Sequence, residues 1–509
     1  MLRAIRNLGR LIRIAATLAR YDALSAFSRF GLPPALMWFA GRLARRRGEG
    51  RPGQRLAAAF AALGPSFIKL GQALSIRADL VGDEVAADLS QLQDRLPPFP
   101  ADRARATVAA ELGQPLEALF RSFDDAPVAA ASIAQVHFAI TNEGDEVAVK
   151  ILRPGVEDQF ARDLDLFLWI AEKIERHAPR LRRLKPVEVV TTLAESVRVE
   201  MDLRLEAAAA SELAQNFAGD PDFRVPKVDW ARTARRVLTL ERIAGLPVDE
   251  REALIAVGLD PQEIVAKAAR TFFKQVFRDG FFHADMHPGN LFVAPDGTLV
   301  AVDFGIMGRL DQRTRYYLAD MLLGFLNGDY ATVAEVHFRA GYVPPTQSVG
   351  AFTQAARAIA EPIFGRPLHE ISLARLLAQL FQVTEQFQME TQPQLLMLQK
   401  SMLVCEGVGR TLMPEINMWG LARPLIEEWM AANRGPDARV RYVLTEAAAR
   451  IEELPAFVAN LEKSAAMLAS GGVRLHPDSI AALANGRRSL WPWVALALGA
   501  AALVVAIAG

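Results

Sequence analysis

The spacing of hydrophobic and polar positions changes several times along the chain, and each change predicts a different element. Between residues 56 and 96, alanines and leucines recur at helical spacing until Pro97 and Pro98 end the pattern. Beyond residue 124, the runs PVAAAS, QVHFAI and EVAVKIL are typical of strands, with a polar turn at residues 142–145. Helical spacing returns at about 186–217 and dominates from residue 261 onward. Further short strands are expected around residue 225, up to residue 243, and at 291–293 and 299–305.

This order predicts an α+β protein in which a small β-rich lobe precedes a mostly helical lobe. Its length of 509 residues fits two or three hydrophobic cores. The 51% hydrophobic content excludes a disordered chain. Cys405 is the single cysteine, so neither an intramolecular disulfide nor a cysteine-rich zinc site can form, in keeping with a reducing compartment.

The carboxyl-terminal end is unusually apolar. Residues 489–509 carry no charge, and about twenty residues rising roughly 1.5 Å each would cross a hydrocarbon core about 30 Å thick. Trp491 and Trp493 stand where interfacial aromatic residues belong, and Arg487 and Arg488 precede them. We therefore expect a transmembrane helix at 490–508 with the body of the chain on the cytoplasmic side. The alternative is a buried hairpin helix in a soluble core.

The amino-terminal end is strongly basic. Twelve arginines against Asp22 and Glu49 give residues 1–55 a net charge of +10, which the rest of the chain balances with −10. Apolar residues alternate with these arginines at helical spacing, which favours a basic amphipathic arm on an anionic lipid membrane. A basic helix docked on the body and an organellar transit peptide are the alternatives. Overall neutrality argues against nucleic acid as a partner.

Four residues occur in the order that phosphoryl transfer requires. This chemistry needs a cation at the nucleotide phosphates, oxygen ligands for magnesium and a group that orients the acceptor. Lys150 ends a VAVK strand, Asp285 and Asn290 lie five positions apart in HADMHPGN, and Asp303 begins a DFG triplet. Lys150 alone would be read as a strand end, but the combination indicates a kinase-like site.

The HADMH segment also allows a metal interpretation. His283, Asp285 and His287 alternate and would share one face of a strand, which could supply three zinc ligands. The sequence shows no second shell for such a site. His283 fits better as a structural histidine of a kinase loop, and His287 as a hydrogen-bonding residue within the loop.

These motifs together resemble the UbiB family of atypical, kinase-like membrane proteins linked to ubiquinone biosynthesis. The family's KxGQ motif is matched by Lys69 to Gln72, its ExD motif by Glu200 to Asp202, and its lysine-pairing glutamate by Glu206. Its alanine-rich loop corresponds to Ala129–His137. The resemblance implies a bilobal protein-kinase-like fold with an amino-terminal helical extension. Ala209 and Ala284 depart from the pattern expected for the family and for kinases, respectively, without removing a phosphate or magnesium ligand.

The resemblance also implies a role for each matched residue, with ATP and Mg²⁺ as cofactors. Lys150 would hold the phosphates, Glu206 would position Lys150, and Asp285 would orient the acceptor. Asn290 and Asp303 would bind magnesium. The nucleotide would lie against Val128, Ala129, Ala130, Ala131, Ser132, Ile133, Ala134 and Gln135, and against a hinge at Glu241 and Ile243. Lys69, Gln72, Glu200 and Asp202 would form regulatory motifs, with Lys69 and Gln72 on one helix face and Asp202 and Glu206 on another.

The expected function is an ATPase or phosphotransferase that supports ubiquinone biosynthesis at the cell inner membrane, with polyprenyl quinone precursors or other proteins of that pathway as partners. The alternative is a nucleotide-responsive scaffold without turnover; a quinone monooxygenase is disfavoured because the chain lacks a G-x-G-x-x-G after a first strand. The expected segments are a membrane arm at 1–50, a helical extension at 51–124, a small lobe at 125–245, a large lobe at 246–420, a helical region at 421–488 and the span at 490–508.

Overall fold

The computed structural model describes most of the chain up to residue 434. The described residues are 2–23, 50–75, 81–90, 92, 96–177, 185–362, 379, 382–384, 386–389, 392–413, 415 and 418–434. Within them, no helix is both long and apolar enough to cross a membrane. The predicted span at 490–508 lies outside these residues.

An antiparallel sheet forms the small lobe. Its strands run in the order β1-β3-β4-β6, and β2 pairs with β3. The strands are β1 (Phe120–Phe123), β2 (Ala129–Ala130), β3 (Ala134–Thr141), β4 (Glu146–Leu152) and β6 (Val237–Glu241). The predicted turn at 142–145 joins β3 to β4. Since β1 pairs with β3, this sheet begins before residue 125, where the sequence placed the boundary of the lobe.

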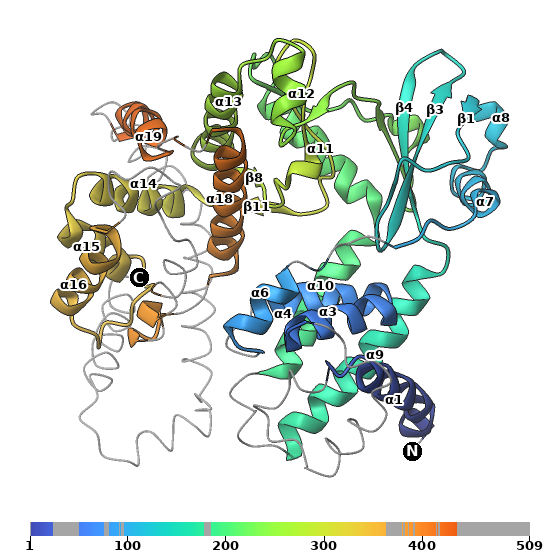
Figure 1. The fold of residues 1–509 in the computed structure, drawn as a ribbon, viewed down its shortest axis with the longest axis horizontal. Helices are drawn as coiled ribbons and strands as arrows, with labels where there is room; N and C mark the ends of the chain where they lie inside the picture. Colours follow the sequence, from blue (N-terminus) through green and yellow to red (C-terminus); the bar gives the residue numbers. More distant parts are fainter. Residues whose placement is uncertain are drawn as a thin grey trace, which may run out of the picture. The chain divides into compact units, whose positions relative to one another are not determined.

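Two short helices cover one face of this sheet (Figure 1). They are α7 (Ala101–Leu112) and α8 (Leu116–Leu119), which follow Pro100 and Pro115. Val108 and Leu119 pack with Val149 and Ile151 of β4 in one buried cluster. Because successive side chains of a strand point to opposite faces, this packing turns Lys150 to the other face of the sheet.

The predicted helical stretch at 56–96 contains three separate helices. They are α3 (Pro52–Leu63), α4 (Pro65–Ser75) and α6 (Asp83–Ser90). They share a core with α9 (Val156–His177) and α10 (Pro186–Glu200), in which Phe67 meets Phe167 edge to face with ring centroids 5.0 Å apart. A Cβ at Gly71 would lie 2.8 Å from Phe60 Cδ2 and 3.1 Å from Leu92 Cδ1, so a glycine is needed at this close contact.

The helical stretch predicted at 186–217 contains two helices, with a break after Glu200. A second helix, α11, begins at Leu203 and ends at Asn216. Asp202 has an extended backbone (φ −127°, ψ 93°), and its side chain accepts a hydrogen bond from the backbone N–H of Arg204. Because Asp202 is the N-cap of α11, it does not share a helical face with Glu206 as predicted.

The basic amino-terminal helix α1 (Leu2–Arg20) lies against the body. Ile14 and Leu18 pack on the main core, and Ala19 is buried. Arg10 forms an ion pair with Asp163 of α9. Ile12 and Arg13 remain exposed. The structure thus shows the docked arrangement that the sequence offered as an alternative to a membrane contact.

The large lobe combines helices with two small sheets (Figure 1). One sheet has the order β5-β10-β9-β7, and the other pairs β8 with β11. The strands are β5 (Phe223–Arg224), β7 (Leu246–Pro247), β8 (Phe281–His283), β9 (Leu291–Val293), β10 (Leu299–Ala301) and β11 (Met307–Arg309). The helices are α12 (Arg251–Ala256), α13 (Pro261–Phe273), α14 (Gln312–Leu326), α15 (Tyr330–Arg339), α16 (Val349–Ala360), α18 (Pro393–Leu412) and α19 (Met418–Arg434). The segment between β8 and β9 carries Asp285 and Asn290, and the segment between β10 and β11 carries Asp303.

Candidate active site

Lys150 lies between two carboxylates from different parts of the chain. Its Nζ is 2.7 Å and 3.0 Å from the two carboxylate oxygens of Glu206 on α11, and 3.0 Å from Oδ1 of Asp303. The Lys150 side chain is 16% exposed and that of Glu206 is 7% exposed, whereas that of Asp303 is 48% exposed. The structure therefore brings together three of the residues predicted from the sequence, with Asp303 on the open side.

The three charges alter one another's protonation. Burial opposes ionisation of Asp303, but the ammonium of Lys150 outweighs it and lowers the pKa of Asp303 to about 2. At Glu206 burial prevails over the attraction of Lys150 and raises the pKa to about 7. Against the effect of burial, the two carboxylates raise the pKa of Lys150 above its usual value. Lys150 is therefore held as a cation between the ionised Asp303 and the buried carboxyl group of Glu206.

The alanine-rich loop is a tight turn between β2 and β3. Val128 and Ala129 are exposed, whereas the segment from Ser132 to Gln135 is buried. Arg153 donates hydrogen bonds from Nε and Nη2 to the carbonyl oxygen of Ala131, at 3.1 Å and 2.8 Å. The guanidinium thus fixes the backbone of this turn. A glycine-rich phosphate loop would have more conformational freedom.

Gln135, predicted to face the nucleotide, uses its side chain within the small lobe. Its Oε1 accepts a hydrogen bond from the backbone N–H of Phe99 at 3.0 Å, and its Nε2 lies 2.7 Å from Nε2 of His137. Since Gln135 donates in the second contact, His137 carries its proton on Nδ1 and donates to the carbonyl oxygen of Asp124 at 2.7 Å. Burial lowers the pKa of His137 and keeps this ring neutral.

The predicted hinge begins at the end of β6. Glu241 directs its carboxylate to Arg224, with a 2.9 Å contact between Oε1 and Nη1. Ile243 follows as a half-buried residue. A Cβ at Gly245 would come within 2.8 Å of the carbonyl oxygen of Val293, so this residue allows the hinge to pass close to β9. The hinge therefore joins the small lobe to β9, the strand that follows the candidate catalytic loop at residues 284–290.

The loop after β8 holds Asp285 and Asn290 together. Asn290 donates from Nδ2 to the carbonyl oxygen of Asp285 at 3.0 Å. The backbone N–H of Val302 donates to the carbonyl oxygen of Asn290 at 2.9 Å, which ties this loop to the strand that leads into Asp303. The five-residue spacing recognised in the sequence thus closes a compact loop.

Both histidines of the loop have structural roles. His283 is fully buried, and its Nδ1 accepts from the backbone N–H of Asp285 at 3.2 Å. Burial lowers the pKa of His283. His287 accepts from the backbone N–H of Gly289 through Nδ1, also at 3.2 Å. Among the described residues, no three histidine, cysteine or acidic side chains gather as metal ligands, so the zinc interpretation gains no support.

Asp303 and Asn290 offer donor atoms that suit magnesium. Since Nδ2 of Asn290 donates to a carbonyl oxygen, its amide oxygen remains available as an acceptor. Asp303 has a left-handed backbone (φ 64°), an uncommon conformation for a residue other than glycine and one found at functional sites. Carboxylate and amide oxygens are ligands that Mg²⁺ prefers. The residues present therefore fit this ion.

A lysine that the sequence analysis did not select also reaches the site. Lys400 of α18 places Nζ 2.8 Å from Oδ1 of Asp285, with side chains 50% and 33% exposed. Lys400 lies 115 positions from Asp285 and in no recognised motif, so the sequence alone gave no signal for it. Figure 1 shows α18 (orange-brown) beside β8 and β11, in agreement with its contacts to β11.

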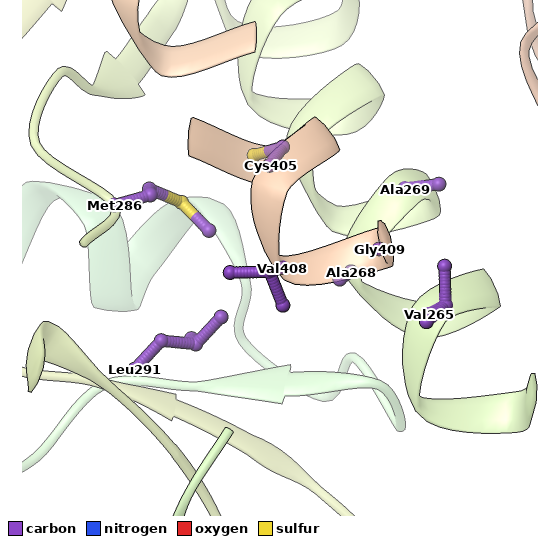
Figure 2. A pocket seen from close by; sticks show the side chains of 8 residues that line it. All are labelled: Val265, Ala268, Ala269, Met286, Leu291, Cys405, Val408 and Gly409. Atoms are coloured by element: carbon purple, nitrogen blue, oxygen red, sulfur yellow. The ribbon is translucent and has the colours of Figure 1, made fainter. Parts of the chain in front are cut away.

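An apolar pocket lies next to this contact. Figure 2 shows Met286 and Leu291 facing Cys405 and Val408 of α18, with α13 on the other side. Met286 follows Asp285 directly, and Leu291 follows Asn290. The catalytic loop is thus packed against α18 by apolar side chains as well as by the ion pair. The residues that line the pocket are Val265, Ala268, Ala269, Met286, Leu291, Cys405, Val408 and Gly409.

The predicted regulatory motifs meet on the amino-terminal side. Lys69 of α4 forms an ion pair with Glu200 at the end of α10, with 2.7 Å between Nζ and Oε2. Both side chains are nearly buried, at 11% and 9% exposed. Gln72 is half-buried on the same helix as Lys69, whereas Asp202 turns to Arg204. The KxGQ and ExD motifs therefore connect α4 to α10, the helix that precedes α11.

Comparison with known proteins agrees with this arrangement. An ABC1 atypical kinase-like domain matches residues 91–337, and a UbiB helical domain matches residues 356–417. A protein of Marinobacter nauticus named probable protein kinase UbiB is 42% identical over 463 residues, covering 88% of this chain and 83% of its own. A protein of the same name from Xylella fastidiosa is also 42% identical, covering 82% and 76%.

A solved structure shares the fold. It is a Mycobacterium tuberculosis protein, determined in complex with erythromycin, that is 28% identical with a TM-score of 0.51 and covers 72% of this chain and 93% of its own. Together with the extent and identity of the sequence matches, this similarity agrees with the kinase-like arrangement of the described residues. The chain belongs to the UbiB family of ABC1 atypical kinase-like proteins.

Proposed function

We propose that this protein binds ATP with Mg²⁺ and transfers the γ-phosphoryl group to an acceptor hydroxyl or to water. The observation that carries the proposal is the contact of Lys150 with both Glu206 and Asp303. A cation held by a buried glutamate, with a second carboxylate on the open side, is the arrangement that kinase chemistry uses at the nucleotide phosphates. The magnesium ion, held by Asp303 and Asn290, would neutralise charge on the phosphates.

Asp285 would act on the acceptor. In the transfer, the acceptor oxygen forms a bond to the γ-phosphorus, the bond from that phosphorus to the β–γ bridging oxygen breaks, and ADP leaves. The proton of the acceptor passes to the carboxylate of Asp285, which is one-third exposed. The loop contacts of Asn290 and His283 keep this residue in place.

Family membership and the composition of the two terminal segments support a proposal for the setting of this activity. We propose that it supports ubiquinone biosynthesis at the cell inner membrane, with the kinase-like body on the cytoplasmic side. The apolar segment at 490–508 would anchor the chain, and the side of the basic arm that stays exposed, which carries Arg13, would contact anionic lipids. Polyprenyl quinone precursors or other proteins of the pathway would be its partners.

The second candidate is a nucleotide-responsive scaffold without turnover. The alanine-rich loop favours it, because Arg153 fixes the turn at Ala131 and the segment from Ser132 to Gln135 is buried. Such a loop has less freedom to close over phosphates than a glycine-rich one. The two candidates differ in one measurable property, which is turnover.

Hydrolysis of ATP by the purified full chain, in mild detergent with anionic lipid, tests the proposal. We expect magnesium-dependent turnover that falls by about 10²-fold or more in Asp303→Asn, because the carboxylate that would hold the magnesium ion at the phosphates is lost. Equal rates for wild type and variant would reject the enzymatic function and leave the scaffold.

A second experiment tests the pathway. Deletion of the gene for this protein should lower the cellular ubiquinone content and accumulate an early polyprenyl precursor. An unchanged ubiquinone content would reject the proposed pathway.

A further inference from the structure

Helix α18 contacts the catalytic loop along three successive turns. Lys400 forms the ion pair with Asp285, and the hydroxyl of Ser401 lies 3.4 Å from the carbonyl oxygen of His283. One turn later, Cys405 and Val408 face Met286 and Leu291 across the apolar pocket (Figure 2). Arg251 of α12 donates to the carbonyl oxygen of Leu412 at 2.9 Å and holds the end of α18. Lys400 is therefore presented by a helix whose following turns, from Ser401 to Leu412, contact the rest of the lobe.

The carboxylate of Asp285 has few other contacts. Nδ2 of Asn290 lies 3.5 Å from Oδ2, but its shorter hydrogen bond goes to the carbonyl oxygen of Asp285. Among the described residues, Lys400 makes the short polar contact with this carboxylate, at 2.8 Å. The orientation of the group thus depends on a side chain from outside the loop.

The loop supplies no cation of its own at this place. Met286, the residue after Asp285, is buried at 2% exposed and lines the apolar pocket. The ring of His287 accepts the hydrogen bond from Gly289. The positive charge beside Asp285 comes instead from the helical domain that follows the kinase-like domain, since Lys400 lies within the match at 356–417.

We propose that Lys400 is a positioning residue that holds the carboxylate of Asp285 in the orientation needed to receive the acceptor's proton. The inference rests on the proposed function, because it assigns a role within the same transfer. A carboxylate that rotates away from the acceptor loses the benefit of preorganisation, and a small misplacement is costly in rate. The helical domain thereby contributes directly to the reaction through one ammonium group.

A purely structural role predicts a different result. An ion pair as exposed as this one contributes little to stability, so its loss should leave the folded state intact. A structural role would appear as lower thermal stability with unchanged turnover per folded molecule. A positioning role would lower kcat and leave the KM for ATP little changed. The reason is that Lys400 contacts Asp285 and does not contact Lys150 or Asp303.

The kinetic test compares four variants of the full chain in mild detergent with anionic lipid. Lys400→Met keeps the length of the side chain and removes its charge, so we expect kcat to fall by about 10²-fold. Lys400→Arg keeps a cation and should restore most of the turnover. Met402→Ala, an exposed neighbour on α18, and Lys185→Met, which removes an exposed lysine paired with Glu188 at 3.0 Å, should behave as wild type.

A zero-length carbodiimide cross-link gives a readout that needs no activity. Activation of the Asp285 carboxylate lets the amine of Lys400 form an amide bond while the urea leaves, and mass spectrometry should find the peptides of the two residues joined. Lys400→Arg should lose this cross-link and keep its turnover, because a guanidinium does not react in this way.

The outcomes separate the inference from the function on which it rests. A wild type without turnover would reject the proposed function and the role of Lys400 with it. A wild type with turnover that Lys400→Met retains would reject the positioning role alone. The role would also be rejected by a missing cross-link in the wild type, or by a rise in the KM for ATP with unchanged kcat.

Discussion

The two halves of the candidate site are built in different ways. On the proposed nucleotide side, Lys150 and Glu206 are nearly buried and extend from the regular elements β4 and α11. On the acceptor side, Asp285 lies in a loop and pairs with Lys400, a half-exposed residue of a distant helix. Buried charges depend strongly on their partners for stability, whereas exposed charges mainly affect one another's orientation. The first half should therefore respond to substitution in stability and activity together, and the second in activity alone.

The largest effect is expected from Lys150→Ala. Turnover should fall by about 10²–10³-fold, because the cation at the phosphates is lost. The free energy of unfolding should also fall by about 3 kcal/mol, since Glu206 is left buried without its partner. ATP binding, turnover and chemical denaturation measure these effects.

A double variant serves as the control. Lys150→Met combined with Glu206→Gln removes both charges and should regain stability without regaining turnover. If Lys150→Ala were as stable as the wild type, the buried half of the site would not depend on its ion pair for stability, and the contrast with the Asp285–Lys400 half would be wrong.

A smaller effect, confined to stability, is expected from the ion pair between Lys69 and Glu200. Lys69→Met should lower the free energy of unfolding by about 3 kcal/mol, because Glu200 is 9% exposed and would lose its cation. Chemical denaturation measures the loss. The matched pair on the surface of α10, Lys185 with Glu188, should contribute less than about 1 kcal/mol, and a similar loss at both pairs would show that burial is not the deciding factor.

The smallest effect is expected on α18 at a position outside both halves of the site. Gly407 is an exposed position of α18, and a Cβ there would meet no atom within 4 Å. Gly407→Ala should raise the free energy of unfolding by about 1 kcal/mol through helix propensity. Thermal unfolding followed by circular dichroism measures the gain. A loss of stability would mean that α18 is not seated as described.

Sequence reasoning succeeded where short stretches of chain carry the geometry. Asp285 and Asn290 close one loop, and the apolar residues of the strands around Lys150 and before Asp303 are legible, so residue types and spacing together singled out all four groups. Their roles in catalysis remain predictions. The two-lobed order was also predictable, because a change from strand to helix periodicity depends on neighbouring residues alone.

What the sequence could not provide depends on contacts between distant segments. Lys400 looks like any exposed lysine on a helix until α18 is placed beside Asp285. Arg153 fixes the alanine-rich turn from the far end of β4, and nothing in the turn itself indicates this. The break at Asp202 was missed for another reason, because an aspartate is equally compatible with a helix face and with an N-cap.

The docking of α1 has a consequence for any surface that competes for this helix. Ile14 and Leu18 are covered by the body, and Arg10 is engaged by Asp163. A lipid surface or partner that binds the same apolar stripe must first displace these contacts, so its observed affinity is reduced by the free energy of docking. Because docking and binding compete for the same face, a substitution that weakens docking, such as Asp163→Asn, strengthens binding of α1 to the competing surface by up to the same factor.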